Sequence, residues 1–180
     1  MGKKIVWTIT YFVLLLLCFC SIVFLCFSLK YPLKYHDIIA SQSEKFSFSP
    51  ELIASVINCE SSFNKDAKSA VGAVGLMQIM PSTGQWVALK MSKPFSVEML
   101  FDAEKNVEIG CFYLKYLLEK FKNLPTCLAA YNAGEGVVKK WIDTNKFLFD
   151  GKDFVSCPYS ETTKYVHNVL SSLKFYEKRF

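Results

Sequence analysis

The sequence predicts a mainly α-helical protein, built from one N-terminal transmembrane helix and one globular domain. Three observations support this fold class. Apolar residues recur at helical spacing in most segments after residue 48, no alternating apolar–polar stretch is long enough for a useful strand, and residues 5–29 contain no charged side chain. We therefore expect a membrane anchor at residues 1–30, a juxtamembrane linker at 31–48 and the globular domain at 49–180.

The anchor is predicted from the uncharged run at residues 5–29. As a helix its about 25 residues would span ~37 Å, which exceeds the ~30 Å hydrocarbon core of a bilayer. A cleaved signal peptide is the alternative, but its apolar region has roughly 7–15 residues and ends at a small-residue cleavage site. Residues 27–30 (FSLK) offer no such site, and Cys18, Cys20 and Cys26 lack the small preceding residues of a lipid-modified cysteine. The run therefore favours an uncleaved anchor. Its orientation stays open, because basic residues flank both ends: Lys3, Lys4, Lys30 and Lys34.

The first helix of the globular domain has a clear start signal. Residues 34–47 before it are polar and are interpreted as the linker. Ser49 is a capping residue, Pro50 suits the first helical position, and Glu51 lies near the positive end of the helix dipole. Apolar residues then continue at helical spacing, so this helix should run to about Glu60.

The remaining elements are also predicted to be helices. They are expected at residues 81–90, at 103–121 with Asp102 as the cap, at 125–132 with a stop at Gly134, at 137–143, and from a cap at Ser160 onward. In the last of these helices the spacing places Tyr165 among the residues that face inward.

Composition argues against several function classes. The net charge is +5, from 21 basic and 16 acidic residues, and the mild excess favours an anionic envelope surface. Nucleic acid is a poor partner, because the lysines are scattered and form no basic block. We expect no metal or other cofactor, since His36 and His167 are the only histidines and no cysteine group has zinc-site spacing. A domain of this size does not need disulfides, so unpaired buried thiols are favoured for its four cysteines: Cys59, Cys111, Cys127 and Cys157.

Glu60 is the principal candidate for catalysis. It lies at the predicted C-terminal end of its helix, where the partial negative charge of the helix disfavours an anion. Apolar neighbours such as Ile57 and Phe63 act in the same direction by removing water from the carboxyl group. Both effects raise its pKa, and a carboxylic acid that stays protonated near neutral pH can donate a proton to a departing glycosidic oxygen. Taken alone, the residue is also consistent with a routine surface contact at a helix end.

Three blocks of sequence favour the catalytic role of Glu60 over a surface contact. They are residues 60–64 (ESSFN) with 72–83 (GAVGLMQIMPST), residues 129–134 (AAYNAG) and residues 158–166 (PYSETTKYV). In this order they closely resemble the lytic transglycosylases of the soluble (Slt) type, which are relatives of goose-type lysozyme. The resemblance covers roughly residues 49–169 and implies a lysozyme-like (goose-type) fold for the globular domain.

The resemblance also implies a reaction. Enzymes of this family cut the β-1,4 bond between N-acetylmuramic acid and N-acetylglucosamine in peptidoglycan without adding water. Glu60 matches their catalytic acid, which then acts as the base and withdraws the proton of the C6 hydroxyl, so that a 1,6-anhydro ring closes. The substrate's own acetamido oxygen stabilises the sugar cation, so this reaction belongs with the substrate-assisted exceptions to the two-carboxylate rule.

Six further residues match substrate-binding positions of that family: Ser61, Met77, Gln78, Tyr131, Asn132 and Glu161. Ser61 is expected to support the catalytic turn. Met77 and Gln78 are expected to meet the sugar face and its acetamido group. Tyr131 offers a hydroxyl near Glu60 or near the acetamido group.

Structural roles for several of these residues stay open. Met77 and Met80 can each fill the core, Asn132 can end its helix as a cap, and Glu161 can serve as an acid in a first helical turn. Glu135 departs from the pattern, because many relatives carry proline at that position. We expect a local change in that turn and no change in activity.

Other functions also stay open. A hydrolase of the goose-lysozyme kind would need a second group to place water, and Asp66 and Glu161 are the nearest candidates by sequence. A wall-binding scaffold without activity would be expected to lose the acid, yet Glu60 and Tyr131 are both present. A cysteine nucleophile at Cys59 has no histidine partner in a recognisable motif. With peptidoglycan as the substrate, the protein would span the cell membrane once and hold its domain on the extracytoplasmic side.

Overall fold

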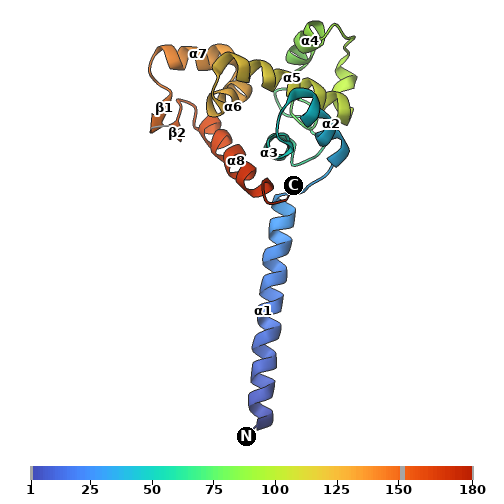
Figure 1. Cartoon of the computed structure of the whole chain (residues 1–180), viewed down its shortest axis with the longest axis vertical. Helices are drawn as coiled ribbons and strands as arrows, with labels where there is room; N and C mark the ends of the chain where they lie inside the picture. The colour runs from blue at the N-terminus through green and yellow to red at the C-terminus, as the bar shows by residue number, and fades with distance from the viewer. Residues whose placement is uncertain (1, 151–152, 180) are drawn as a thin grey trace. The chain divides into compact units, whose positions relative to one another are not determined.

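The computed structural model describes residues 2–150 and 153–179, and the side chains at positions 3–6, 24, 26–29, 150 and 153 lie outside this description. The chain divides into two compact units, Met1–Pro32 and Leu33–Phe180 (Figure 1).

The first unit is dominated by helix α1 (Gly2–Lys30). Its described side chains are mostly apolar and exposed, with Trp7 at 74% as an example. The predicted apolar run is only partly covered, because Lys3, Lys4 and both ends of the run at residues 5 and 29 lie outside the described side chains. Within the described part of the chain, no helix has the length and apolar character needed to cross a membrane.

The second unit is mainly helical, as expected (Figure 1). Its elements are α2 (His36–Phe46), α3 (Pro50–Ser61), α4 (Pro81–Lys90), the 3-10 helix η1 (Val97–Phe101), α5 (Ala103–Phe121), α6 (Leu124–Ala133), α7 (Glu135–Asp143), β1 (Leu148–Asp150), β2 (Asp153–Ser156) and α8 (Ser160–Tyr176). Helix α5 packs against α2, α4 and α6, and α8 packs against α3 and α6. The core of the unit therefore lies between α5, α6, α3 and α8.

Side-chain caps begin three of these helices, namely α3, α5 and α6. Ser49 Oγ accepts a hydrogen bond from the Leu52 amide at 3.3 Å, and Asp102 Oδ1 accepts one from the Lys105 amide at 2.9 Å. Both caps were predicted, and each satisfies an amide that has no partner inside its helix. The expected cap at Ser160 is wrong, because Ser160 is the first helical residue and Tyr159 occupies the capping position without a side-chain bond.

The predicted linker at residues 31–48 is wrong for most of its length. Residues 36–46 form helix α2, which packs against α3 and α5. Ile39 on this helix and Phe48 just after it are buried in the core. The helix was missed because its other positions are largely polar, so the buried stripe is too narrow to give a clear periodic pattern.

A short antiparallel hairpin of β1 and β2 was also not predicted. Phe149 pairs with Phe154, and Leu148 pairs with Ser156 across a bulge. Strands of three and four residues carry too few side chains to show an alternating pattern. The four cysteines of this unit, Cys59, Cys111, Cys127 and Cys157, are all free thiols.

Candidate active site

Glu60 lies in the last turn of α3 and is half-buried. Burial raises the pKa of its carboxyl group from an ordinary 4.5 to about 7, while the neighbouring Tyr165 hydroxyl partly opposes that rise by favouring the carboxylate. The helix ends at Ser61, because Ser62 and Phe63 both adopt positive φ angles. Phe63 is buried and its ring lies 6.4 Å from that of Tyr176 on α8, which holds the end of α3 in place. A substantial fraction of the Glu60 carboxyl groups is therefore protonated near neutral pH.

Tyr165 on α8 is a site residue that the sequence placed only in the core. Its side chain is 8% exposed, and its hydroxyl oxygen is buried without a hydrogen-bond partner among the described residues. Its pKa is raised well above 10 by burial and then by the charge of Glu60. The phenol is thus close enough to act on the Glu60 carboxyl group without a formed hydrogen bond in this structure. A hydroxyl on the inward face of an amphipathic helix is the sequence signal that could have identified it.

Tyr131 on α6 is also close to Glu60. Burial, followed by the charge of Glu60, raises its pKa well above 10. Its hydroxyl donates a hydrogen bond to the Met77 carbonyl at 2.9 Å. The hydroxyl proton of Tyr131 is therefore used within the protein. Toward a substrate, the Tyr131 oxygen can only accept a hydrogen bond.

The backbone turn that faces Tyr131 depends on a buried asparagine that the sequence did not reveal. Asn106 on α5 accepts a hydrogen bond from the Met77 amide at 2.8 Å and donates to the carbonyls of Val74 (2.9 Å) and Leu100 (2.8 Å). Gly75 has a φ of 79°, and a Cβ there would lie 2.2 Å from the Asn106 amide nitrogen. Both the positive φ and the lack of space require glycine at this position.

Ser61 joins the end of α3 to the same turn. Its hydroxyl is within donating distance of the carbonyls of Leu76 (2.8 Å) and Ile57 (3.3 Å). Its proton is used inside the protein, so Ser61 stabilises the turn, and toward a substrate it can only accept.

The two methionines differ from the expectation. Met77 is 0% exposed and packs against Gly110, where an added Cβ would lie 2.4 Å from its sulfur. The prediction that Met77 meets the sugar face is therefore wrong for this structure. Met80, for which core filling was considered, is 38% exposed and lines a cavity beside Tyr131. Gln78, which lies between Met77 and Met80, has a positive φ and bends the chain there. The Met77 side chain therefore enters the core, whereas the Met80 side chain is exposed.

This cavity has a volume of about 250 Å³. Its lining residues come from the turn, α4, α5 and the end of α6: Gln78, Ile79, Met80, Thr83, Tyr113, Tyr131, Asn132, Ala133 and Gly134. Of the predicted site residues it brings together Gln78, Tyr131 and Asn132. Glu60 is not among its lining residues and is linked to it through Tyr131, on whose hydroxyl the Glu60 charge acts. Its walls combine aromatic, thioether and amide groups, which suit a sugar with an acetamido substituent.

Hydrogen bonds hold the two amides of this cavity in place. Gln78 Nε2 donates to the carbonyls of Ala67 (3.2 Å) and Gly75 (3.0 Å). Asn132 Oδ1 accepts a hydrogen bond from Thr162 Oγ1 at 2.7 Å, which links α6 to α8. The helix cap considered for Asn132 is not its role, because Gly134 occupies the C-cap. Glu161 is exposed in the first turn of α8 and is not among the residues that line this cavity.

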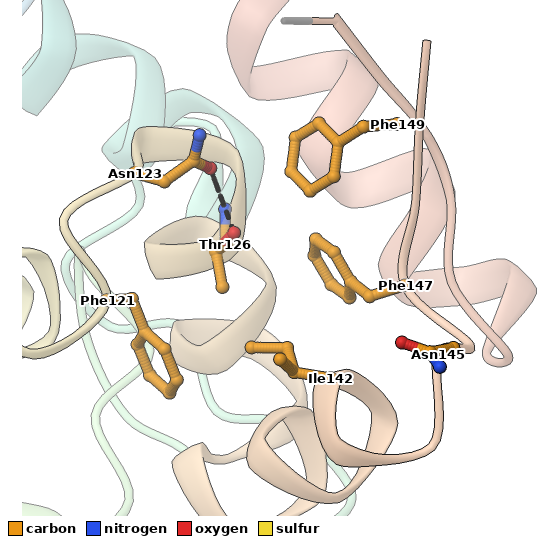
Figure 2. Close-up of a pocket in the computed structure, with 7 residues that line it drawn as sticks. All are labelled: Phe121, Asn123, Thr126, Ile142, Asn145, Phe147 and Phe149. Carbon is orange, nitrogen blue, oxygen red and sulfur yellow. Dashed lines mark hydrogen bonds between the residues drawn. The ribbon is translucent and has the colours of Figure 1, made fainter. Parts of the chain in front are cut away.

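A larger cavity, of about 600 Å³, lies elsewhere in the domain (Figure 2). Phe121, Ile142, Phe147 and Phe149 contribute apolar walls, and Asn123, Thr126 and Asn145 contribute polar groups. Figure 2 shows Asn123 bonded to Thr126 at the start of α6. None of its lining residues is titratable and none is shared with the cavity beside Tyr131, so it lacks the groups for acid–base chemistry.

Comparisons with known proteins agree with this geometry. Residues 37–153 match the family model described as the transglycosylase SLT domain. The soluble lytic murein transglycosylase of Escherichia coli (strain K12) is 38% identical over 151 residues, which cover 82% of this chain and 23% of that protein. The membrane-bound lytic murein transglycosylase D of the same strain is 34% identical over 139 residues, which cover 74% of this chain and 29% of that protein.

Solved structures give the same result. The crystal structure of the 70 kDa soluble lytic transglycosylase from Escherichia coli matches with a TM-score of 0.76 and 38% identity, over 82% of this chain and 25% of that chain. An inactive mutant of the lytic transglycosylase Slt from Pseudomonas aeruginosa matches with a TM-score of 0.75 and 30% identity, over 84% of this chain and 25% of that chain. The chain thus spans about a quarter of the length of these curated relatives and solved structures.

Proposed function

Because the chain belongs to the transglycosylase SLT domain family, we propose that it is a peptidoglycan lytic transglycosylase that uses Glu60 first as an acid and then as a base. The observation that carries this proposal is the raised pKa of Glu60, about 7, together with two tyrosines, Tyr131 and Tyr165, that lie close enough to feel its charge. The proposed substrate is the glycan strand of peptidoglycan, cut between N-acetylmuramic acid and N-acetylglucosamine.

In the first step the protonated Glu60 donates its proton to the oxygen of the bond that breaks. The leaving N-acetylglucosamine departs as an alcohol, and positive charge develops on the ring of the muramic acid. The proton is available because burial disfavours the carboxylate at neutral pH. Tyr165 then stabilises the carboxylate that is left, since its hydroxyl is buried, unpartnered and close to Glu60.

In the second step the Glu60 carboxylate withdraws the proton of the C6 hydroxyl, and the C6 oxygen closes a 1,6-anhydro ring on the sugar. Glu60 is then protonated again and no water is consumed. The substrate's acetamido oxygen stabilises the cation between the two steps. Gln78 and Asn132 orient that acetamido group in this proposal, which is supported by their position on the lining of the cavity.

Hydrolysis is the less favoured alternative, because it needs a second group that positions water opposite Glu60. Asp66 is exposed and forms an ion pair with Lys65 at 2.8 Å. Glu161 is exposed at the start of α8. Neither of these two carboxylates has the burial that raises the pKa of Glu60.

The products that the enzyme releases from purified sacculi distinguish ring closure from hydrolysis. We expect every new muramic acid end to carry the anhydro ring, and its mass to be lower by one water than that of the hydrolysed fragment. Mass spectrometry of the digest distinguishes the two directly, with a goose-type lysozyme as the hydrolytic control. Fragments with only reducing ends would show that water is the acceptor.

We also propose that α1 is a single-pass membrane anchor with the catalytic domain on the extracytoplasmic side. The support is the uncharged apolar run at residues 5–29, which extends beyond the described side chains, and the exposed apolar surface of α1. A curated relative is named as membrane-bound, which supports attachment to a membrane. Such an anchor would confine cleavage to the wall layers nearest the membrane.

Fractionation tests the anchor. We expect the full-length protein to stay with membranes after an alkaline carbonate wash, and a variant without residues 2–30 to be released. Protease added to spheroplasts should digest the domain of the full-length protein. Recovery of the full-length protein in the soluble fraction would contradict the anchor, and a protected domain would contradict the orientation.

A further inference from the structure

The cavity of about 600 Å³ drawn in Figure 2 has no part in the proposed reaction. Its volume falls within the range of about 300–1,000 Å³ that is usual for ligand pockets. Residues 147–149 form one wall, and the start of α6 forms the wall opposite (Figure 2). The end of α7 contributes Ile142, whose side chain is 42% exposed. Apolar surface is thus open to a ligand, and no residue that lines it also lines the cavity beside Tyr131.

The wall at residues 147–149 belongs to an open sheet edge. Among the described residues, strand β1 pairs only with β2. Strand β2 is in turn held against α8, where His167 Nε2 lies 3.0 Å from the Val155 carbonyl oxygen and the His167 ring lies 5.3 Å from that of Phe154. The free edge of the hairpin is therefore that of β1. Such an edge presents backbone N–H and C=O groups with which an extended peptide can pair.

The side chains of a strand added at this edge can enter the cavity. In a strand every second side chain points to the same face, and two such side chains are about 7 Å apart. Phe147 and Phe149 line the cavity, whereas Leu148 between them does not. The Phe147 ring lies 5.5 Å from that of Phe149 and 5.2 Å from that of the buried Phe154, which holds this wall in place. The wall therefore favours apolar side chains at alternate positions of the peptide.

Two amides at opposite ends of the cavity suit the main chain of such a peptide (Figure 2). Asn123 Oδ1 accepts hydrogen bonds from the Thr126 amide at 3.0 Å and the Thr126 hydroxyl at 2.9 Å. Its Nδ2 group is left to donate to a ligand. Asn145 is exposed and carries both a donor and an acceptor. A peptide backbone uses both kinds of group, whereas the acyl chains of a lipid use neither.

The charges around the cavity favour an acidic occupant. No lining residue is ionisable, but an exposed lysine is the chain neighbour of a lining residue on each side: Lys122 follows Phe121, and Lys146 precedes Phe147. Neither lysine forms an ion pair within the described part of the chain. Residues 139–146 carry three lysines and one aspartate. Carboxylates of a bound segment therefore meet an excess of positive charge.

We propose that the β1 edge and this cavity form a docking site for an extended segment of a partner protein, in which apolar side chains alternate with acidic ones. The segment adds a strand to the hairpin beside β1. Its apolar side chains fill the space between Phe149 and Ile142, and its carboxylates lie near Lys122 and Lys146. The docking site does not depend on the reaction at Glu60, because it uses none of the same residues.

Synthetic peptides test the docking site. The probe is a short, end-blocked fluorescent peptide in which phenylalanine and valine alternate with glutamate, and it is titrated with the full-length protein in mild detergent. We expect saturable binding below about 1 mM by fluorescence anisotropy. The same peptide with lysine in place of glutamate should bind at least about tenfold more weakly, because its charges repel Lys122 and Lys146. Bound probe should also slow hydrogen exchange of the β1 amides, which then gain partners.

Charge substitutions locate the bound peptide. Ile142→Asp places a like charge on the cavity wall and should weaken binding of the acidic probe about tenfold or more, and Lys146→Glu should weaken it about three- to tenfold. Leu89→Asp and Lys174→Glu make the same kinds of change at exposed positions outside the cavity and should bind the probe within about twofold of the parent. Circular dichroism checks the fold of each variant. If Ile142→Asp does not fold, the surface substitution Lys146→Glu still tests the site.

The outcomes decide between a peptide and other occupants. A lack of saturable binding, or equal binding of the acidic and the basic peptide, would overturn the proposal. Undiminished binding by the folded Ile142→Asp and Lys146→Glu proteins would overturn it as well, since the peptide would then bind elsewhere. Slower exchange of the β1 amides in nanodiscs of anionic phospholipid, without any such change on addition of the probe, would make a lipid surface the occupant.

Discussion

Glu60→Gln is expected to lower the rate of glycan cleavage on the order of 10²- to 10⁴-fold, the usual contribution of a positioned acid and base. Glutamine keeps the size and shape of the side chain, but it can neither donate the proton to the leaving oxygen nor accept one from the C6 hydroxyl. The measurement is the release of soluble fragments from purified sacculi, with binding to sacculi followed in parallel. Binding and helical content should be retained, because glutamine fills the same space at the end of α3.

The protonation of Glu60 should also appear in how cleavage and stability depend on pH, which tests its role independently. The folded pKa of about 7 lies above the ordinary 4.5, so the unfolded chain loses this proton first. Glu60 therefore favours the folded state at low pH, and this contribution is lost as the pH rises from about 4.5 through about 7. Cleavage by the parent should fall above pH 7, and Glu60→Gln should be more stable than the parent at pH 8 and not at pH 4.

Glu119→Gln is the matched control, because Glu119 is an exposed carboxylate on α5. It should leave both the cleavage rate and the pH profile unchanged. A Glu60→Gln protein that cleaves as fast as the parent would remove Glu60 from the mechanism. Undiminished wall binding by an inactive parent would instead favour a scaffold without activity.

Asn106→Leu is expected to have the largest effect on stability. The substitution leaves the Met77 amide and the carbonyls of Val74 and Leu100 without their partner inside the core. Each unsatisfied buried group costs about 1–3 kcal/mol, so the loss of partners for three groups is expected to cost roughly 3–9 kcal/mol in total. A domain is stable by only about 5–15 kcal/mol, and the variant should therefore be near the limit of folding.

Urea unfolding followed by circular dichroism measures this loss. Asn168→Leu, at an exposed position on α8, is the control and should stay within about 0.5 kcal/mol of the parent. Any Asn106→Leu protein that remains folded should also have lost activity, because the turn that carries Gln78 and accepts the Tyr131 hydroxyl is no longer held. A variant as stable as the parent would show that Asn106 is not the support of this turn.

Several features of the domain could be predicted from the sequence because they depend on neighbours in the chain. The starts of α3 and α5 follow from Ser49 and Asp102, whose side chains bond amides three residues away. The ends and lengths of most helices follow from the same kind of local signal. Glu60 could be named as the candidate acid because its helix end and its apolar neighbours are also local, and the sequence blocks around it identified the family.

Other features were decided only by contacts between distant segments. Asn106 lies 29 residues from Met77, whose amide it binds, and Tyr131 reaches the Met77 carbonyl across 54 residues. Met77 is buried and Met80 is exposed because the turn is fixed from α5, which no local pattern encodes. The apposition of Tyr165 and Glu60 likewise arises where α8 packs against α3. The sequence by itself thus determined the helices and the candidate acid, whereas the tertiary structure decided which side chains face that acid, since burial and orientation depend on the packing of the whole domain.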